Sequence, residues 1–168
     1  MAKYIDKIEF HNLLKEYKGY EDGIKHCEQI KKNVDDKFTT EEILDAEKNI
    51  RVFKAKQKKP YNEIGKRFLL IAQNYINKPR YINYTESWKD DLVSEAVYDM
   101  VRYIHNYDVE RMDSRHESAK IIPDPFSYFS QYCENGMTRY LKDRYKDMNI
   151  MVKLPFIENM DKREVSYE

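Results

Sequence analysis

One side of a predicted helix in the C-terminal half of the chain combines aromatic, amide and basic side chains. A helical repeat of 3.6 residues places seven of them along one stripe: Tyr128, Gln131, Tyr132, Asn135, Arg139, Lys142 and Lys146. Basic groups contact phosphates, amides reach base edges, and tyrosine rings stack on unpaired bases. The stripe therefore indicates a nucleic-acid contact. The alternative is a solvated face whose tyrosines partly cover the core.

A second predicted helix, over residues 84–107, has a mixed polar face. Its apolar side is expected to be core and consists of Leu92, Val93, Ala96, Val97, Met100, Val101 and Ile104. The opposite side consists of Asp91, Ser94, Glu95, Tyr98, Asp99 and Arg102. We interpret this polar side as a surface that docks a partner protein. The alternative is an ordinary solvated face with one partly covered tyrosine.

The overall charge of the chain is balanced. It carries 30 Lys plus Arg and 30 Asp plus Glu in 168 residues, so its formal net charge is zero. Charge alone therefore neither supports nor excludes nucleic acid as a partner, and any binding must depend on a local basic face. Aromatic residues make up 14% of the chain, including 15 tyrosines. Such rings suit wet interfaces as well as cores, which fits both polar faces.

The sequence lacks the motifs that are typical of enzymes and metal sites. Cys27 and Cys133 stand apart without CxxC spacing, and the four histidines form no HExxH-like cluster. The four glycines form no phosphate-binding loop, and no GxSxG motif occurs. We therefore expect no catalysis, no metal and no cofactor. No apolar run approaches the roughly 20 residues that cross a bilayer, which predicts a cytoplasmic protein without membrane contact.

The spacing of apolar residues predicts an all-α fold. The expected helices span residues 4–17, 20–34, 39–57, 60–76, 84–107 and 125–145. Three of them have start signals: Thr39 as an N-cap, Pro60 in a first turn, and Thr85 before a long amphipathic run. The last helix is expected to bury Phe126, Phe129, Cys133, Met137, Tyr140 and Leu141. Gly136 would permit the close approach of a neighbouring helix.

These elements indicate one compact helical domain with two extensions. Residues 1–59 are expected to form an N-terminal helical extension packed on the core, and residues 60–147 the main domain. Within the main domain, residues 109–124 form a charged connector. Residues 148–168 form a short C-terminal tail whose apolar cluster consists of Leu154, Phe156, Ile157 and Met160.

Several short strings in the main domain resemble those of known transcription factors. Residues 91–96 (DLVSEA), followed by MVR at 100–102 and NYD at 106–108, resemble region 2.2 of bacterial primary sigma factors, and residues 126–129 (FSYF) resemble the start of their region 2.3. Residues 84–89 (YTESWK) are similar to a segment of the divergent late-transcription sigma factors of T-even-type bacteriophages. The likeness covers residues 61–146, and Trp88 with its flanks is its most specific element.

The resemblance implies a sigma region 2-like domain that binds the bacterial RNA polymerase core and directs melting of a TATA-like promoter element. The polar face of residues 84–107 would dock on the clamp helices of the largest polymerase subunit. Tyr128, Phe129 and Tyr132 would lie where unstacked bases are captured, and Asn135, Arg139 and Lys142 near upstream DNA. Because periodicity places Phe129 in the core, we assign base contact to Tyr128 and Tyr132.

In that family an apolar C-terminal tail reaches the polymerase flap and the DNA sliding clamp. The four apolar tail residues named above are the comparable cluster, and packing on the core is the alternative. A late coactivator is a further partner that the resemblance implies. Two other functions stay open from the sequence: a polymerase-binding regulator without promoter recognition, and a stand-alone module that binds single-stranded nucleic acid.

Overall fold

The computed structural model describes residues 5–32, 38–110 and 124–147, and every regular element in these ranges is a helix. In chain order the elements are α1 (Lys7–Lys32), α2 (Thr40–Ile76), α3 (Glu86–Arg102), the 3-10 helix η1 (Ile104–Asn106) and α4 (Pro125–Asp147). The predicted all-α fold is confirmed. The expected connector lies mostly outside the described residues, and so does the whole tail with Leu154, Phe156, Ile157 and Met160.

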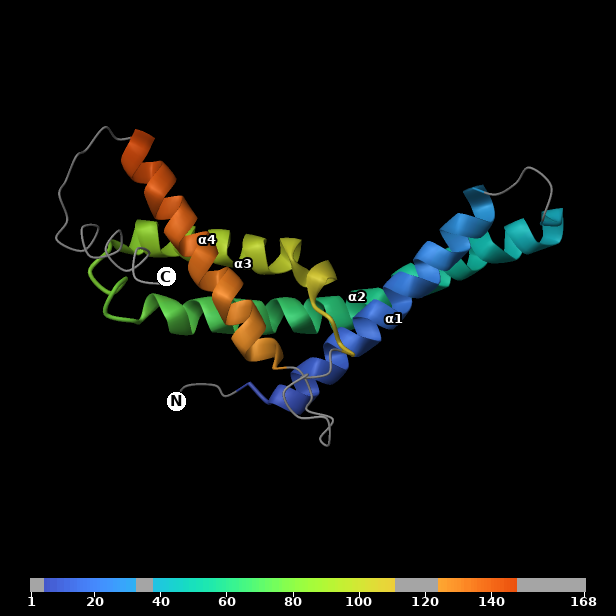
Figure 1. The fold of residues 1–168 in the computed structure, drawn as a ribbon, viewed down its shortest axis with the longest axis horizontal. Coiled ribbons are helices and arrows are strands. Elements are labelled where there is room, and N and C mark those ends of the chain that lie inside the picture. The colour runs from blue at the N-terminus through green and yellow to red at the C-terminus, as the bar shows by residue number, and fades with distance from the viewer. Residues whose placement is uncertain (1–4, 33–37, 111–123, 148–168) are drawn as a thin grey trace, which may run out of the picture.

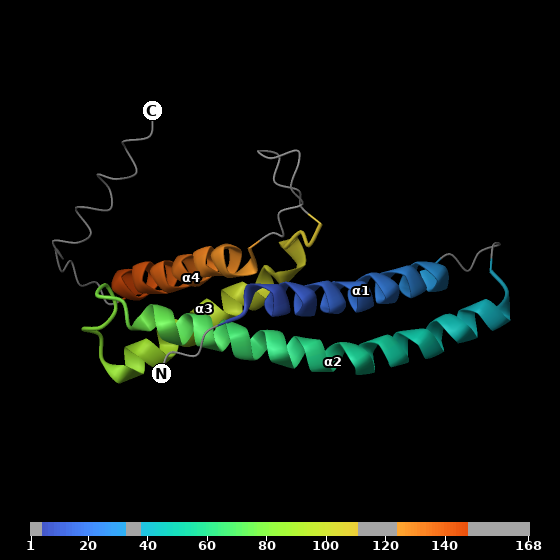
Figure 2. The same ribbon diagram turned by 90° about the horizontal axis from the view of Figure 1, so that it is seen from below.

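Helices α1 and α2 form a long antiparallel hairpin, which extends well beyond α3 and α4 (Figure 1). Figure 2 shows the same hairpin from below, with α4 and α3 packed against one end of it. Ring contacts give the register: Tyr17 lies beside Tyr61 with centroids 5.7 Å apart, and Tyr20 lies beside Phe53 at 6.4 Å. We call residues 18–32 and 40–59, the half of the hairpin away from α3 and α4, the arm.

Two predicted helix breaks are wrong. Residues 4–17 and 20–34 were expected to be separate helices, but α1 is continuous through Gly19, because apolar residues on both sides of it pack on α2. Residues 39–57 and 60–76 likewise belong to one helix. The expected boundary between the extension and the main domain, at residues 59 and 60, therefore lies inside α2.

Pro60 lies in the interior of α2 rather than in a first turn. A proline there removes one backbone hydrogen bond and bends a helix, at a cost of about 3 kcal/mol. Helix α2 changes direction about midway along its length (Figure 1). Pro60 is buried, and the burial of its ring offsets part of this cost. The other two start signals were read correctly: Thr39 and Glu42 form a capping box at the start of α2, and Thr85 is the N-cap residue of α3, without a side-chain capping bond.

The core joins α1 to the main domain through three phenylalanine rings. Phe10 of α1 contacts Phe68 of α2 and Phe129 of α4, with centroid distances of 6.1 and 5.8 Å, and Phe68 lies 4.6 Å from Phe129. All three side chains are fully buried, which confirms the core assignment of Phe129. Phe126 was also expected in the core but is 41% exposed, because it lies in the first turn of α4 at the margin of the core.

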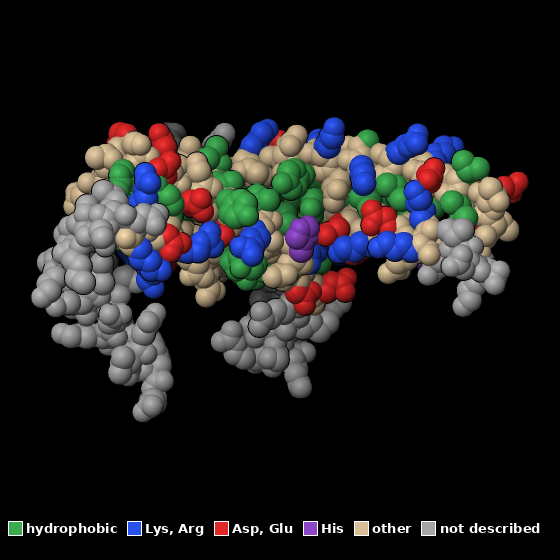
Figure 3. All heavy atoms as spheres, turned by 90° about the horizontal axis from the view of Figure 1, so that it is seen from above, with side chains coloured by type: hydrophobic (Ala, Val, Ile, Leu, Met, Phe, Trp, Pro, Cys, Tyr) green, Lys and Arg blue, Asp and Glu red, His purple; other side chains and the backbone are tan. Residues whose placement is uncertain are grey.

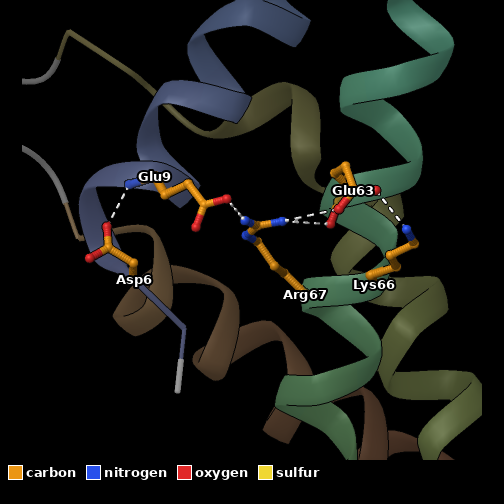
Figure 4. A network of polar contacts seen from close by, with 5 residues as sticks. All are labelled: Asp6, Glu9, Glu63, Lys66 and Arg67. Carbon is orange, nitrogen blue, oxygen red and sulfur yellow. Dashed lines mark hydrogen bonds and ion pairs between the residues drawn. The ribbon is translucent and has the colours of Figure 1, made fainter. Parts of the chain in front are cut away.

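A polar network on the surface ties the start of α1 to α2 (Figure 4). Arg67 of α2 bridges Glu9 of α1 and Glu63 of its own helix, and Lys66 donates to Glu63 over 2.6 Å. Because several of these groups are exposed to solvent, the network fixes the orientation of the helices more than it stabilises the fold. None of the helices in the described part of the chain is both long and apolar enough to span a membrane.

Candidate nucleic-acid and partner-docking site

Helices α3 and α4 approach each other closely at Gly136. A Cβ atom at this position would lie 3.0 Å from Asp99 Oδ2, 3.1 Å from the Glu95 carbonyl oxygen and 3.2 Å from Ala96 Cα. Two of these three neighbours are backbone atoms, which cannot turn away as a flexible side chain can. The predicted role of Gly136 in admitting a neighbouring helix is therefore confirmed, and it brings the polar side of α3 against α4.

A bidentate ion pair between Asp99 and Arg139 joins the two helices. Arg139 donates from Nη1 to Asp99 Oδ2 over 2.7 Å and from Nη2 to Asp99 Oδ1 over 2.8 Å. The Asp99 side chain is only 2% exposed, whereas the Arg139 side chain is 41% exposed. The hydrogen bonds to Asp99 raise the pKa of the Arg139 guanidinium above its ordinary value.

This pair corrects one sequence prediction and adds to another. Asp99 was expected on the docking face, but its carboxylate is buried and is held by Arg139. Arg139 was expected to contact DNA; its guanidinium binds Asp99 in a bidentate manner and is still 41% exposed, so its contact with DNA stays a prediction. A helical wheel could not show this, because it treats each helix alone and does not include the crossing helix at Gly136. Both residues position α3 and α4.

Two further residues of the predicted docking face also contact α4. Tyr140 donates its hydroxyl hydrogen to Asp91 Oδ2 over 2.6 Å, and Arg139 Nη2 lies 3.4 Å from Glu95 Oε2. Burial, followed by this hydrogen bond, raises the pKa of Tyr140. Tyr140 was expected in the core and is instead partly buried with its hydroxyl group paired. Asp91 and Glu95 therefore serve the packing of α3 on α4 before any partner binds.

The remaining docking residues form an exposed strip along α3, which consists of Ser94, Tyr98 and Arg102. Tyr98 is 59% exposed, which is high for so large a ring. Ser94 is exposed and donates its hydroxyl hydrogen to the Asp90 carbonyl oxygen over 2.9 Å, so its donor is already used within α3. The Arg102 guanidinium lies 5.6 Å from the centre of the Tyr103 ring. The candidate partner surface is therefore narrower than the sequence predicted.

Four tyrosines form a cluster where the end of α3 meets the start of α4. Tyr103 and Tyr132 are stacked with centroids 4.5 Å apart and planes 24° apart. Tyr128 lies 4.9 Å from Tyr132 and 5.2 Å from Tyr107. The sequence singled out Tyr128 and Tyr132 but missed Tyr103 and Tyr107 as their partners. The spacing of residues within 125–145 could not indicate these two rings, because they belong to the segment that follows α3.

The two predicted stacking residues are both partly buried but differ in their contacts. Tyr128 packs edge-on against the buried Phe129 ring at 4.9 Å, and its hydroxyl group lies 3.4 Å from both the Tyr103 carbonyl oxygen and the Tyr132 hydroxyl oxygen. Burial and the neighbouring hydroxyl group raise the pKa of Tyr128. Tyr128 therefore packs the tyrosine cluster against the core. Tyr132 is partly buried as well and follows the exposed Gln131 on α4, so we take it as the candidate stacking platform.

The polar residues of the α4 stripe flank this platform and reach solvent. Gln131 and Asn135 are exposed beside Tyr132, and Lys142 and Lys146 are exposed towards the end of the helix. Lys146 lies 3.4 Å from Asp143 in a weak local pair. Trp88, the most specific residue of the sequence resemblance, packs between Tyr84 and Tyr145 and has a structural role here. The polar residues of the stripe are therefore exposed as predicted, except that Arg139 is bound to Asp99.

The described residues contain no group of three or more His, Cys, Asp or Glu side chains that could hold a metal ion. Cys27 and Cys133 are both buried as free thiols. No protein-family model, no curated protein and no solved structure matches the chain.

Proposed function

We propose that the protein is a sigma-type transcription factor of the T-even phage late class, which binds the bacterial RNA polymerase core and helps to melt a TATA-like promoter element. The proposal rests on the sequence strings at residues 84–108 and 126–129. One structural observation carries it further: the exposed strip of α3 and the amide-rich stripe of α4 meet at Tyr103, whose ring stacks on Tyr132 and lies beside Arg102. A partner held on the strip would lie next to the stripe.

In this proposal the protein performs no covalent chemistry, since the polymerase supplies catalysis. A base that leaves the duplex would stack on the Tyr132 edge of the tyrosine cluster, while Gln131 and Asn135 offer hydrogen-bonding groups. Stacking contributes about 1 to 3 kcal/mol per base in known single-strand binders, and unstacking costs a few kcal/mol. The free energy gained by stacking is similar to the cost of unstacking, so the tyrosines would stabilise a strand that is already open but would not open the duplex alone.

The neutral charge of the chain fits a factor that depends on its partner. Without a net positive charge, it gains little long-range attraction to DNA. Useful affinity would therefore appear only with polymerase, in the cytoplasm of the host cell. Contacts of the tail with the polymerase flap, the sliding clamp or a late coactivator belong to the same proposal and lie outside the described residues.

The decisive experiment is transcription from a supercoiled plasmid that carries a TATA-like element, using bacterial core polymerase with and without the full-length protein. We expect transcripts that start at the element only when the protein is present. A stable complex with polymerase but no promoter-specific transcript would instead indicate a polymerase-binding regulator. Tight binding to a single-stranded oligonucleotide without polymerase would indicate a stand-alone nucleic-acid module.

Variants separate the two surfaces. Tyr98→Ala with Arg102→Ala should weaken association with core polymerase at least tenfold, because both side chains are exposed on α3. Gln131→Ala with Asn135→Ala should leave association unchanged and reduce permanganate reactivity of the melted thymines. Gln73→Ala with Asn74→Ala is the matched control, since these are also exposed helical amides but lie on α2. Equal loss in the control would count against the assigned stripe.

A further inference from the structure

The outer side of α2 carries the strongest concentration of one charge sign in the described chain. Between residues 48 and 59 there are six basic residues and no acidic one, although the protein as a whole has zero net charge. They are Lys48, Arg51, Lys54, Lys56, Lys58 and Lys59. We call these six residues the basic segment. The preceding two turns are acidic, with Glu41, Glu42, Asp45 and Glu47, so positive charge is segregated along the helix.

All six side chains of the basic segment are exposed. None of them forms an ion pair with another described residue. The acidic residues that flank the segment have other partners: Glu47 pairs with Lys31 over 2.7 Å, and Glu63 pairs with Lys66 over 2.6 Å. Glu47 also interacts electrostatically with Arg51, and Glu63 with Lys59, so two of the six charges are partly offset by the fold. The remaining positive charge is available to an external anion.

The hairpin fixes the direction of this charge. The inner side of α2 packs on α1 through residues such as Ala46, Phe53 and Pro60, and Phe53 also lies against Gly23. At 100° per residue, five of the six basic positions fall on the half of the helix opposite that inner side, and Lys56 lies towards its margin with α1. The segment is about 17 Å long at 1.5 Å per residue. In Figure 3, Lys and Arg side chains lie along both margins of the arm, with Asp and Glu side chains among them.

We infer that the basic segment of α2 binds the phosphate backbone of double-stranded DNA, at a position separate from the α4 stripe. A duplex presents one negative charge per about 1.7 Å of its axis, so 17 Å of helix matches the phosphates along about half a turn. Lysine is a flexible point charge that suits backbone contact without base recognition. The choice of DNA over another polyanion rests on the proposed function; the anion contact rests on charge alone.

The basic segment would then bind the duplex that flanks the opened element, independently of its sequence. Lysine and arginine side chains spread over the surface of a helix contact the phosphates of any sequence equally well. Binding through the basic segment should therefore be weak in isolation and strongly dependent on salt.

The test is fluorescence anisotropy of an end-labelled, non-promoter 30-base-pair duplex with the full-length protein over a series of KCl concentrations. The triple variant Lys48→Gln, Arg51→Gln, Lys59→Gln removes three charges from the centre of the outer side. We expect it to lower affinity at least about tenfold at low salt. The slope of log affinity against log salt should fall by about 2 to 3, since each lost phosphate contact removes about 0.9.

The matched control is Lys7→Gln, Lys15→Gln, Lys78→Gln, which makes the same change in net charge at exposed positions outside the arm. It should stay within about twofold of the unmodified protein. Equal losses in both triples would overturn the proposal, because the effect would then be one of overall charge. The proposal would also be overturned if the basic-segment triple variant bound the DNA duplex normally but no longer bound core polymerase, because the segment would then be a protein-docking surface. A clear preference of the unmodified protein for an RNA duplex would overturn it too.

This outcome is distinguishable from that of the proposed function. The anisotropy assay contains no polymerase and no promoter, so a protein that fails in transcription can still show the salt-dependent loss. A protein that supports promoter-specific transcription can still show no loss of duplex affinity in the triple variant. Circular dichroism at 222 nm on both triples checks that the helical hairpin is intact, and only exposed side chains are changed.

Discussion

The guanidinium of Arg139 on α4 donates two hydrogen bonds, of 2.7 and 2.8 Å, to the carboxylate of Asp99 on α3. The carboxylate lies inside the protein, whereas the guanidinium reaches the surface. The pair closes over Gly136, where the two helices are nearest. It therefore sets the angle at which α4 presents its polar stripe, and the unequal burial of its members makes the effects of substitution unequal.

Arg139→Met should destabilise the fold by about 3 to 5 kcal/mol, because it leaves the buried Asp99 carboxylate without a partner. Asp99→Asn should cost less, about 1 to 2 kcal/mol, since the exposed end of Arg139 can reach water. Urea unfolding followed by circular dichroism measures both. Glu95→Gln is the control and should change stability by less than about 1 kcal/mol, because its contact with Arg139 is longer and exposed. The reverse order for Arg139 and Asp99 would contradict the burial argument.

Gly136→Ala and Gly19→Ala should shift stability in opposite directions. At Gly136 the added methyl group meets the α3 backbone at 3.1 Å, so we expect a loss of about 1 to 3 kcal/mol. At Gly19 nothing lies within 4 Å of the added Cβ atom, and the position is mid-helix, so alanine should stabilise by about 0.5 to 1 kcal/mol. Thermal unfolding of the two variants side by side is sufficient, and shifts of the same sign would refute the close approach.

The contrast between these glycines shows what the sequence could predict. Periodicity identified the helical class, the buried side of α3 and the buried position of Phe129, because these depend on one helix at a time. It also predicted breaks near Gly19 and Pro60, because both residues disfavour helices locally. The contacts made by a neighbouring helix outweigh that local preference, and a wheel of one helix does not contain them.

The candidate site was predictable to the same extent. The α4 stripe follows from spacing within one helix, and its exposed members Gln131, Asn135, Lys142 and Lys146 lie where the spacing placed them. Asp99 and Arg139 were assigned to two different surfaces, although they bind each other, because nothing in the sequence says that residues 40 positions apart meet. Polar residues beside a buried glycine are the signal that could have indicated the pair.

Stability should fall as pH drops below about 6.5, in part because of His11. Burial lowers the pKa of His11, with Lys15 and Lys7 adding to the effect, and Nδ1 lies 3.2 Å from the Tyr107 hydroxyl oxygen. The unfolded chain, with a pKa of 6.5, therefore binds a proton that the folded chain resists. The contribution of His11 is complete above pH 6.5 and is lost as pH falls towards its folded pKa.

His11→Asn should flatten this part of the profile, because asparagine can still accept a hydrogen bond from Tyr107 but does not titrate. The measurement is the free energy of unfolding in urea at pH 7.5, 6.5 and 5.5. His26→Asn, at an exposed position of α1, is the control. A His11→Asn profile as steep as that of the unmodified protein would show that another group causes the loss.

The Cys133 thiol should be inert in the folded protein. It is fully buried, and burial raises its pKa to about 12, so the thiolate that attacks disulfide reagents is scarce. At pH 8 we expect Ellman's reagent to react with the native protein at least about a hundredfold more slowly than with protein in guanidinium chloride. Cys133→Ala reports Cys27 alone, which is also buried. Rapid reaction of the native unmodified protein, absent from Cys133→Ala, would contradict the buried position.

The continuity of α2 through Pro60 sets the rotational phase between the two ends of the molecule. One helix carries both the basic segment and the residues that pack under α3 and α4, so the number of residues between them fixes a direction as well as a distance. One inserted residue would turn the lysines by about 100° relative to the tyrosines, whereas seven would nearly restore their direction while lengthening the reach by about 10 Å. Length changes in this hairpin should therefore be tolerated in multiples of a heptad.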